Sequence, residues 1–178
     1  MSFPIAFELV DTKNVWDEDI KVEKKTYNQY KKLKIEVDND LKDYNATIEI
    51  DSTYRSVAEQ QDLWDEWSED PDKGPEYVKK FVAVPGYSEH HTGLAIDICL
   101  KVNGKLIDDN DDMIAQKEIF SKVHEKLAKY GFILRYLENK DNITGYSYEP
   151  WHLRYIDNPK IAKEIMENNL TLEEYLKK

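Results

Sequence analysis

Histidine is scarce in this chain, with four copies, and His90 and His152 each lie in a segment dense in other polar residues. Residues 85–97 contain His90 and end at Asp97, and residues 148–155 contain His152. Two imidazoles and one carboxylate suit zinc, and three protein ligands leave a fourth coordination position for water. A single histidine or aspartate is more often structural, but together the three residues predict a metal site.

Asp97 lies in an alternating stretch that predicts a strand, whose apolar face carries Leu94, Ile96, Ile98 and Leu100. Alternation turns Asp97 to the other face, where a buried carboxylate is costly unless it is paired or bound to a metal. Gly93 permits a tight turn before the strand, so His90 can fold back toward Asp97. These two residues alone leave a two-ligand site, and His152 is the natural third ligand.

Glu149 lies three residues before His152, and Pro150 stands between them. Proline argues against a regular central strand, so we expect the local backbone to bend. Regular alternation would place Glu149 and His152 on opposite faces, whereas a bend can present both to one pocket. Glu149 would then act as the general base toward the attacking water.

The chain contains only three arginines, and each has a tyrosine neighbour, namely Arg55, Arg135 and Arg154. Chance also explains this pairing, because the chain has 12 tyrosines. The planar fork of arginine suits bidentate binding of a carboxylate, which a peptidase acting at a free C-terminus needs. Arg55 is the first candidate because it ends a predicted strand just before a helix begins.

Other residues with chemical potential have simpler interpretations. We expect His91 to face away from His90 as a bystander, and His124 to lie at the surface or core edge of a helix. The acidic stretch 108–112 lacks the glycine and the distal glutamate of an EF-hand, so a solvated loop is favoured. Three large aromatic residues are expected in the core or in a cleft wall: Trp64, Trp67 and Phe81.

Composition narrows the classes of function. Hydrophobic residues make up 40% of the 178, enough for a sizeable core, and the net charge of −11 argues against a nucleic-acid partner. The single cysteine, Cys99, excludes an internal disulfide. No apolar run is long enough to span a membrane, and residues 1–8 show no export signal. We expect a monomer, cytoplasmic, or extracytoplasmic if an export signal is missing from this sequence.

Apolar periodicity predicts a single α+β domain over residues 1–178, with a small, largely antiparallel sheet flanked by helices. A loop is predicted around Pro71, Gly74 and Pro75. The predicted helices cover residues 19–41, 57–67 and 119–130, and two more start at Pro159 and Thr171. The predicted strands cover residues 46–50, 94–100, 105–107, 132–137 and 146–156.

Three segments resemble motifs of the VanY-type D-alanyl-D-alanine carboxypeptidases. Residues 88–97 fit the pattern S-x-H-x-x-G-x-A-x-D, and residues 149–155 fit E-P-W-H-x-R-Y. Residues 54–64 resemble Y-R-S-x-x-x-Q-x-x-L-aromatic. The resemblance covers about residues 48–156, and the order of several independent motifs makes it specific.

The resemblance implies one zinc ion per chain, held by His90, Asp97 and His152, with Glu149 as catalytic base. It implies that Arg55 holds the substrate or stabilises the oxyanion. The implied fold is the small α+β zinc-peptidase fold shared with the hedgehog signalling domain. The residues expected to contact the substrate are Ser88, Gln60, Tyr54, Trp151 and Arg135.

The implied reaction is hydrolysis of the C-terminal D-alanine from bacterial peptidoglycan stem peptides. Two alternatives within the family stay open: an L,D-carboxypeptidase acting on tetrapeptide stems, as in LdcB-like members, and a D,D-dipeptidase like VanX or VanXY. The non-enzymatic alternative is a wall-peptide binding module. Such a module would tend to lose the base or the arginine, and this chain has both Glu149 and Arg55.

Overall fold

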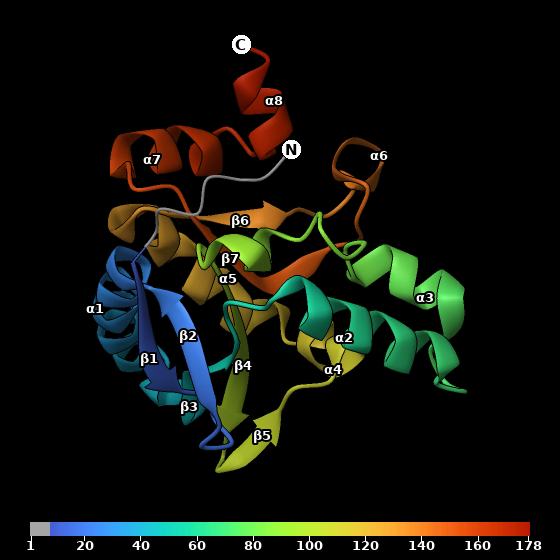
Figure 1. The fold of residues 1–178 in the computed structure, drawn as a ribbon. Helices are drawn as coiled ribbons and strands as arrows, with labels where there is room; N and C mark the ends of the chain where they lie inside the picture. Colours follow the sequence, from blue (N-terminus) through green and yellow to red (C-terminus); the bar gives the residue numbers. More distant parts are fainter. Residues whose placement is uncertain (1–7) are drawn as a thin grey trace.

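The strands that alternation predicts form one antiparallel sheet at the centre of the computed structural model, which describes residues 8–178 (Figure 1). Its order is β3-β4-β7-β6, and β5 pairs with β4 outside this path. Residues 1–7, part of the segment searched for an export signal, lie outside the described residues. The central strands are β3 (Ala46–Ser52), β4 (Ala95–Val102), β5 (Lys105–Ile107), β6 (Phe132–Tyr136) and β7 (Glu149–Tyr155).

Helices surround this sheet, so the predicted α+β class is confirmed (Figure 1). α1 packs on β3 and α5, α7 packs on β6, and α2 and α3 pack together at the other side. Within residues 8–178, no helix is both long and apolar enough to cross a bilayer. The helices are α1 (Lys24–Asp40), α2 (Val57–Glu69), α3 (Gly74–Phe81), α4 (Asn110–Ala115), α5 (Lys117–Leu127), α6 (Asp141–Thr144), α7 (Pro159–Glu167) and α8 (Leu172–Leu176), with 3-10 turns η1 (Lys42–Tyr44), η2 (Glu89–Thr92) and η3 (Ala128–Tyr130).

The predicted helix over 19–41 is wrong in its first five residues. Asp19–Glu23 forms β2, which pairs with β1 (Leu9–Lys13) in a separate two-stranded sheet. The helix begins only after Glu23, whose carboxylate accepts hydrogen bonds from the backbone N–H groups of Lys25 (3.0 Å) and Thr26 (2.7 Å). β1 and β2 form a hairpin across residues 14–18, which the sequence does not reveal because both strands are short and β2 is mostly polar.

The predicted loop around Pro71, Gly74 and Pro75 is wrong in part. α3 begins at Gly74 and carries Pro75 in its first turn. Proline is tolerated there because the first helical N–H groups have no partner within the helix. The helix ends at Phe81, which places that ring beside the central sheet.

Gly93 closes the turn between η2 and β4 with φ +75°. A Cβ at this position would lie 2.7 Å from a Leu9 methyl and 3.1 Å from the Glu23 backbone nitrogen. The Glu23 N–H donates to the Gly93 carbonyl at 3.1 Å. Glycine is therefore required both for the turn and for close packing of the small sheet against it.

Two irregularities in the sheet lie beside the same group of polar residues. The register of β3 on β4 shifts between Ile50 and Ser52, and that of β6 on β7 shifts between Leu134 and Tyr136. Bulges of this kind re-aim side chains and are common next to active sites. The second shift lies opposite Glu149, where the sequence predicted a bend.

Candidate active site

Three polar residues from different elements meet at the middle of the sheet. Asp97 on β4 is the direct cross-strand partner of His152 on β7, and η2 places His90 next to them. Asp97 Oδ2 lies 3.0 Å from His90 Nε2, and Asp97 Oδ1 lies 2.9 Å from His152 Nδ1. One ligand atom from each residue falls within 4.8 Å of the others. The structure thus brings together the three residues that the sequence predicts as metal ligands.

In the neutral form of each ring, its outer hydrogen bond leaves the inward nitrogen without a proton. His90 Nδ1 lies 2.6 Å from the Thr53 carbonyl, which can only accept, so this nitrogen carries the proton and Nε2 is bare. His152 Nε2 lies 3.2 Å from a Glu89 carboxylate oxygen, so it donates and Nδ1 is bare. Both bare nitrogens face Asp97, whose Oδ1 accepts no hydrogen bond of proper geometry from the described residues. Such converging acceptors fit a metal cation.

The charges around the centre also favour a cation. Burial alone would raise the pKa of Asp97, but His90 and His152 hold it well below its usual range. Burial would lower the pKa of His152, but Asp97, Glu89 and Glu149 outweigh burial and raise this pKa to about 10. Without a cation the inner nitrogen of His152 therefore also holds a proton, which a bound metal would displace. Burial lowers the pKa of His90. The site therefore combines one firmly ionised carboxylate with a negative potential at His152.

Glu149 stands at the edge of this centre and is only 3% exposed. One of its carboxylate oxygens lies 3.5 Å from His152 Nδ1. Burial, together with Asp97 and Glu89, raises its pKa well above the ordinary value. A carboxylate with a high proton affinity beside a cation site has the properties of a general base. Both residues reach one cavity, as the predicted bend required.

Arg55 lies across the cavity and is held by two side chains. Its guanidinium donates to Gln60 Oε1 at 2.6 Å and to Ser52 Oγ at 2.9 Å, and its backbone N–H donates to the His90 carbonyl at 3.0 Å. Gln60 is 1% exposed and itself donates to the Ala83 carbonyl at 2.7 Å. Gln60 therefore fixes the direction of Arg55 as well as lining the cavity.

These groups line one cavity of about 180 Å³. Of the predicted substrate contacts, Ser88, Gln60 and Trp151 line it, and Ser88 Oγ also accepts from the His90 N–H at 3.2 Å. Tyr54 and Arg135 are not among its lining residues; the Arg135 guanidinium pairs with Glu89, which lines the cavity, and with Glu173, which does not. The aromatic wall is formed by Trp67, Phe81 and Trp151.

Sequence reasoning missed three residues that shape the site. Glu89, between Ser88 and the first histidine, bonds to the outer nitrogen of His152, and nothing in the local spacing indicates this. Asp51 is the extra residue of the β3 bulge and lines the cavity; burial, with Asp97 and Asp108, raises its pKa to about 7. Side-chain contacts in the folded chain reveal the role of Glu89, and the register of β3 on β4 reveals that of Asp51.

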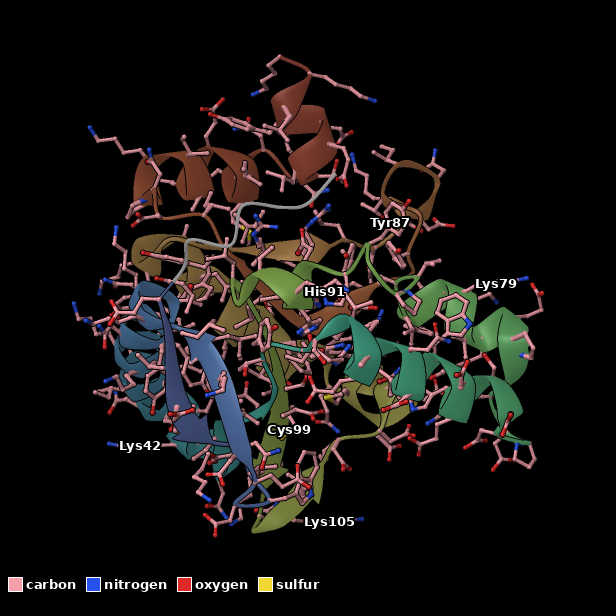
Figure 2. All side chains as sticks on the ribbon, in the orientation of Figure 1. Lys42, Lys79, Tyr87, His91, Cys99 and Lys105 are labelled. Atoms are coloured by element: carbon pink, nitrogen blue, oxygen red, sulfur yellow. The ribbon has the colours of Figure 1, made fainter. Side chains whose placement is uncertain are left out.

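The third missed residue is His91, which was expected to be a bystander. Its Nε2 accepts from the Gly86 N–H at 3.1 Å, so Nδ1 carries the proton that it donates to the Arg55 carbonyl at 2.7 Å. His91 therefore ties the backbone of Arg55 to the loop before η2 (Figure 2). A side chain that can both donate and accept is needed at this position.

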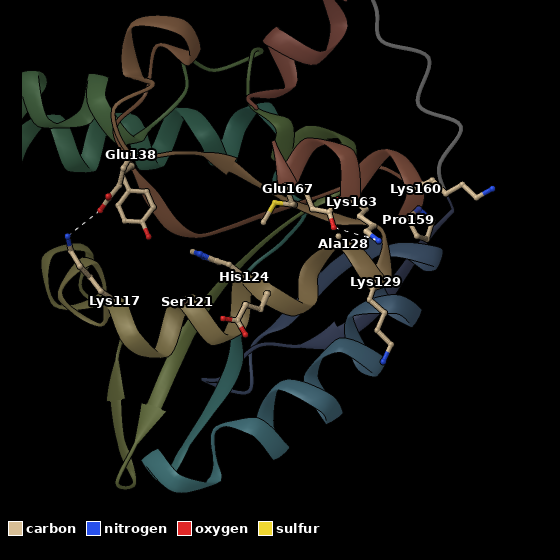
Figure 3. Close-up of a pocket in the computed structure, with 13 residues that line it drawn as sticks. Lys117, Ser121, His124, Ala128, Lys129, Glu138, Pro159, Lys160, Lys163 and Glu167 are labelled. Atoms are coloured by element: carbon tan, nitrogen blue, oxygen red, sulfur yellow. Dashed lines mark ion pairs between the residues drawn. The ribbon is translucent and has the colours of Figure 1, made fainter. Parts of the chain in front are cut away.

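A larger groove of about 930 Å³ lies elsewhere on the molecule (Figure 3). It shares no lining residue with the cavity, and most of its polar side chains are lysines and glutamates at the surface. His124 lies among them and donates from Nε2 to the Pro150 carbonyl at 2.8 Å. Burial lowers its pKa to about 4, so it is a core-edge histidine, as expected.

Comparison with known proteins supports the predicted family resemblance over most of the chain. A family model described as VanY, D-alanyl-D-alanine carboxypeptidase, matches residues 19–158. The Bacillus subtilis protein YodJ is 46% identical over 127 residues, covering 71% of this chain and 44% of YodJ. VanXYC of Enterococcus gallinarum, a bifunctional D-Ala-D-Ala dipeptidase and carboxypeptidase, is 44% identical over 135 residues, covering 72% of this chain and 65% of VanXYC. The chain thus spans about half to two thirds of these relatives.

Solved structures of similar proteins superpose on nearly the whole chain. The LdcB LD-carboxypeptidase superposes with a TM-score of 0.74 at 37% identity, covering 98% of this chain and 81% of LdcB. VanYB in complex with D-alanine-D-alanine superposes with a TM-score of 0.72 at 26% identity, covering 98% and 92%. A vancomycin-resistance D,D-pentapeptidase VanY, in complex with Zn(II), gives 0.71 at 26% identity, covering 98% and 93%. The predicted family resemblance and fold are confirmed.

Proposed function

Because the chain belongs to the VanY family of D-alanyl-D-alanine carboxypeptidases, we propose that it is a zinc carboxypeptidase. Its substrates would be peptidoglycan stem peptides, from which it removes the C-terminal D-alanine. The observation that carries this proposal is the convergence of two inner imidazole nitrogens on a firmly ionised Asp97, next to Glu149. Zinc accepts this set of two nitrogens and one oxygen, and a similar VanY was solved with Zn(II).

His90, Asp97 and His152 would hold the zinc, which would polarise the scissile carbonyl and lower the pKa of a nearby water. Glu149 would accept the proton of the attacking water and return it to the departing amine. Arg55, fixed by Gln60 and Ser52, would stabilise negative charge on the substrate. Each role uses a side chain that lines the one cavity.

Three peptides test the reaction and its specificity together: a stem pentapeptide ending in D-Ala-D-Ala, a stem tetrapeptide with an L,D terminal bond, and the D-Ala-D-Ala dipeptide. We expect release of D-alanine from the pentapeptide, loss of release with a chelator, and recovery with added zinc. Glu149→Gln should keep zinc while turnover falls about 10²–10⁴-fold. The proposal fails if zinc-loaded protein releases no amino acid from any of the three.

The L,D-terminated tetrapeptide is the second candidate substrate. It is favoured by the similarity to LdcB, which at 37% identity exceeds the 26% of VanYB over the same share of this chain. The ratio of kcat/KM for the tetrapeptide and the pentapeptide decides between them. A ratio above one assigns the L,D activity and overturns the D,D preference proposed above.

A further inference from the structure

Behind the metal ligands lies a buried group of charges centred on Glu89. One of its oxygens accepts from Arg135 Nε and from an Arg154 NH group, each at 2.7 Å. The other oxygen accepts from His152 Nε2 at 3.2 Å. The side chain of Glu89 is 13% exposed and lies next to His90 in sequence. Glu89 thus joins the outer edge of one metal ligand to two arginines.

The group continues into the C-terminal helix. The Arg135 guanidinium donates to both carboxylate oxygens of Glu173 on α8, at 2.9 and 2.5 Å. α8 is anchored by the capping box of Thr171 and Glu174, and Glu174 also pairs with Lys140 at 2.8 Å. α8 lies beyond β6 in Figure 1 and outside residues 19–158, which match the family model.

We propose that Glu89 is a positioning residue for the metal ligand His152, and that α8 supports the metal centre through Glu173 and Arg135. This inference rests on the proposed zinc site. Glu89 keeps the proton of His152 on the outer nitrogen, so that the inner nitrogen is free to bind the metal. Glu173 fixes the Arg135 fork, and this arginine in turn fixes Glu89 in place.

Charge balance supports a role beyond packing. The group holds two carboxylates and two guanidinium ions, so it adds no net charge behind the metal. Without the Glu89 charge, Glu173 would still balance one guanidinium, but the group would carry a net charge of +1 beside His152 and would repel a bound cation. Without the Glu173 charge, Arg135 would keep its bond to Glu89 but lose its bidentate clamp, so the effect should be smaller.

The test compares three isosteric variants: Glu89→Gln, Glu173→Gln and Glu174→Gln. The last is the matched control: glutamine can still accept from the Thr171 N–H and keep the capping box, so the variant weakens only the pair with Lys140 and does not touch the group around Glu89. Zinc affinity is measured by competition with a chromophoric chelator, the geometry of the centre by the visible spectrum of cobalt-loaded protein, and the fold by thermal unfolding of metal-free protein.

We expect Glu89→Gln to weaken zinc binding by about 10- to 100-fold and to alter the cobalt spectrum. Glu173→Gln should weaken binding by several-fold, and Glu174→Gln should leave affinity and spectrum unchanged. If Glu89→Gln does not fold, the Glu173→Gln and Glu174→Gln pair decides, since the Glu173 side chain is 29% exposed and tolerates the change.

Wild-type zinc affinity in Glu89→Gln, or equal loss in Glu173→Gln and Glu174→Gln, would overturn the inference and leave the group a purely structural one. Failure of the proposed function looks different: wild-type protein would itself bind no zinc, or would bind zinc and release no amino acid.

Discussion

The small cavity and the large groove differ in how their charges are satisfied, and this difference is more informative than their size. In the groove, Lys117 pairs with Glu138 at 3.4 Å and Lys163 pairs with Glu167 at 3.6 Å, all with half or more of the side chain exposed (Figure 3). Exposed pairs of this kind contribute little.

In the cavity, the charged groups are buried and converge on one point. His90 and His152 direct their inner nitrogens at an ionised Asp97, and Glu149 stands beside them with a raised pKa. Buried acceptors that face one another are expensive unless a cation completes them. The contrast shows that the candidate catalytic residues lie where buried charged groups converge, and that the large groove is a feature of the surface.

In this comparison, the largest effect is expected from removing the guanidinium of Arg55 from the cavity. Arg55→Ala should lower kcat/KM by about 10²–10³-fold, because a preorganised stabiliser of negative charge is lost. The control is Tyr54→Phe, which changes the neighbouring residue outside the cavity and should leave kcat/KM unchanged. Steady-state kinetics with the preferred stem peptide checks both. An Arg55→Ala variant as active as wild type would show that Arg55 does not stabilise the substrate.

The groove should contribute to stability through its one histidine, His124, which is half-buried. The pKa of His124 is about 4 in the folded protein and about 6.5 when unfolded, so the unfolded chain binds a proton first as pH falls. The contribution of His124 to the free energy of unfolding is fully present above pH 6.5. It falls by about 3 kcal/mol as the pH falls toward 4. Urea unfolding of wild type and His124→Gln at pH 7, 5.5 and 4 measures this loss.

His124→Gln should lose less stability than wild type over that interval, because no imidazole remains to be protonated. An identical pH dependence in the two proteins would contradict the assignment. Lys163→Gln serves as the surface control in the same groove, since its pair with Glu167 is exposed. Its unfolding free energy should stay within about 0.5 kcal/mol of wild type.

A smaller effect is expected at His91, which ties the Arg55 backbone to Gly86. His91→Ala removes both hydrogen bonds and should lower the unfolding free energy by about 1–2 kcal/mol. His91→Gln can still donate and accept, so it should recover part of this loss. Equal stability of the alanine and glutamine variants in urea would show that the bridge has no energetic role.

The sequence predicted the metal triad because one turn and two strands, each recognisable from its own residues, bring the three ligands together. One turn carries His90 back to Asp97, and strand pairing sets Asp97 opposite His152. The supporting residues could not be predicted in the same way. Glu89 acts on a residue 63 positions away, and Asp51 enters the cavity only because β3 bulges against β4.

The same limit explains the errors in the fold. The sequence predicts helix over residues 19–23, but these residues pair with Leu9–Lys13 in a hairpin, and two strands of five residues give only a weak alternation signal. The central strands were predicted correctly because their alternation lies within longer, more apolar stretches of sequence. The pairing of short, mostly polar segments is what the sequence does not show.

The most direct test of the account is the zinc content of the purified protein. Metal-free wild type and Asp97→Ala are dialysed against zinc, then against buffer, and their zinc is measured by atomic emission. The account predicts one zinc per wild-type chain and almost none in Asp97→Ala, with both proteins folded by circular dichroism. Wild-type protein without zinc, or Asp97→Ala with a full complement, would contradict it.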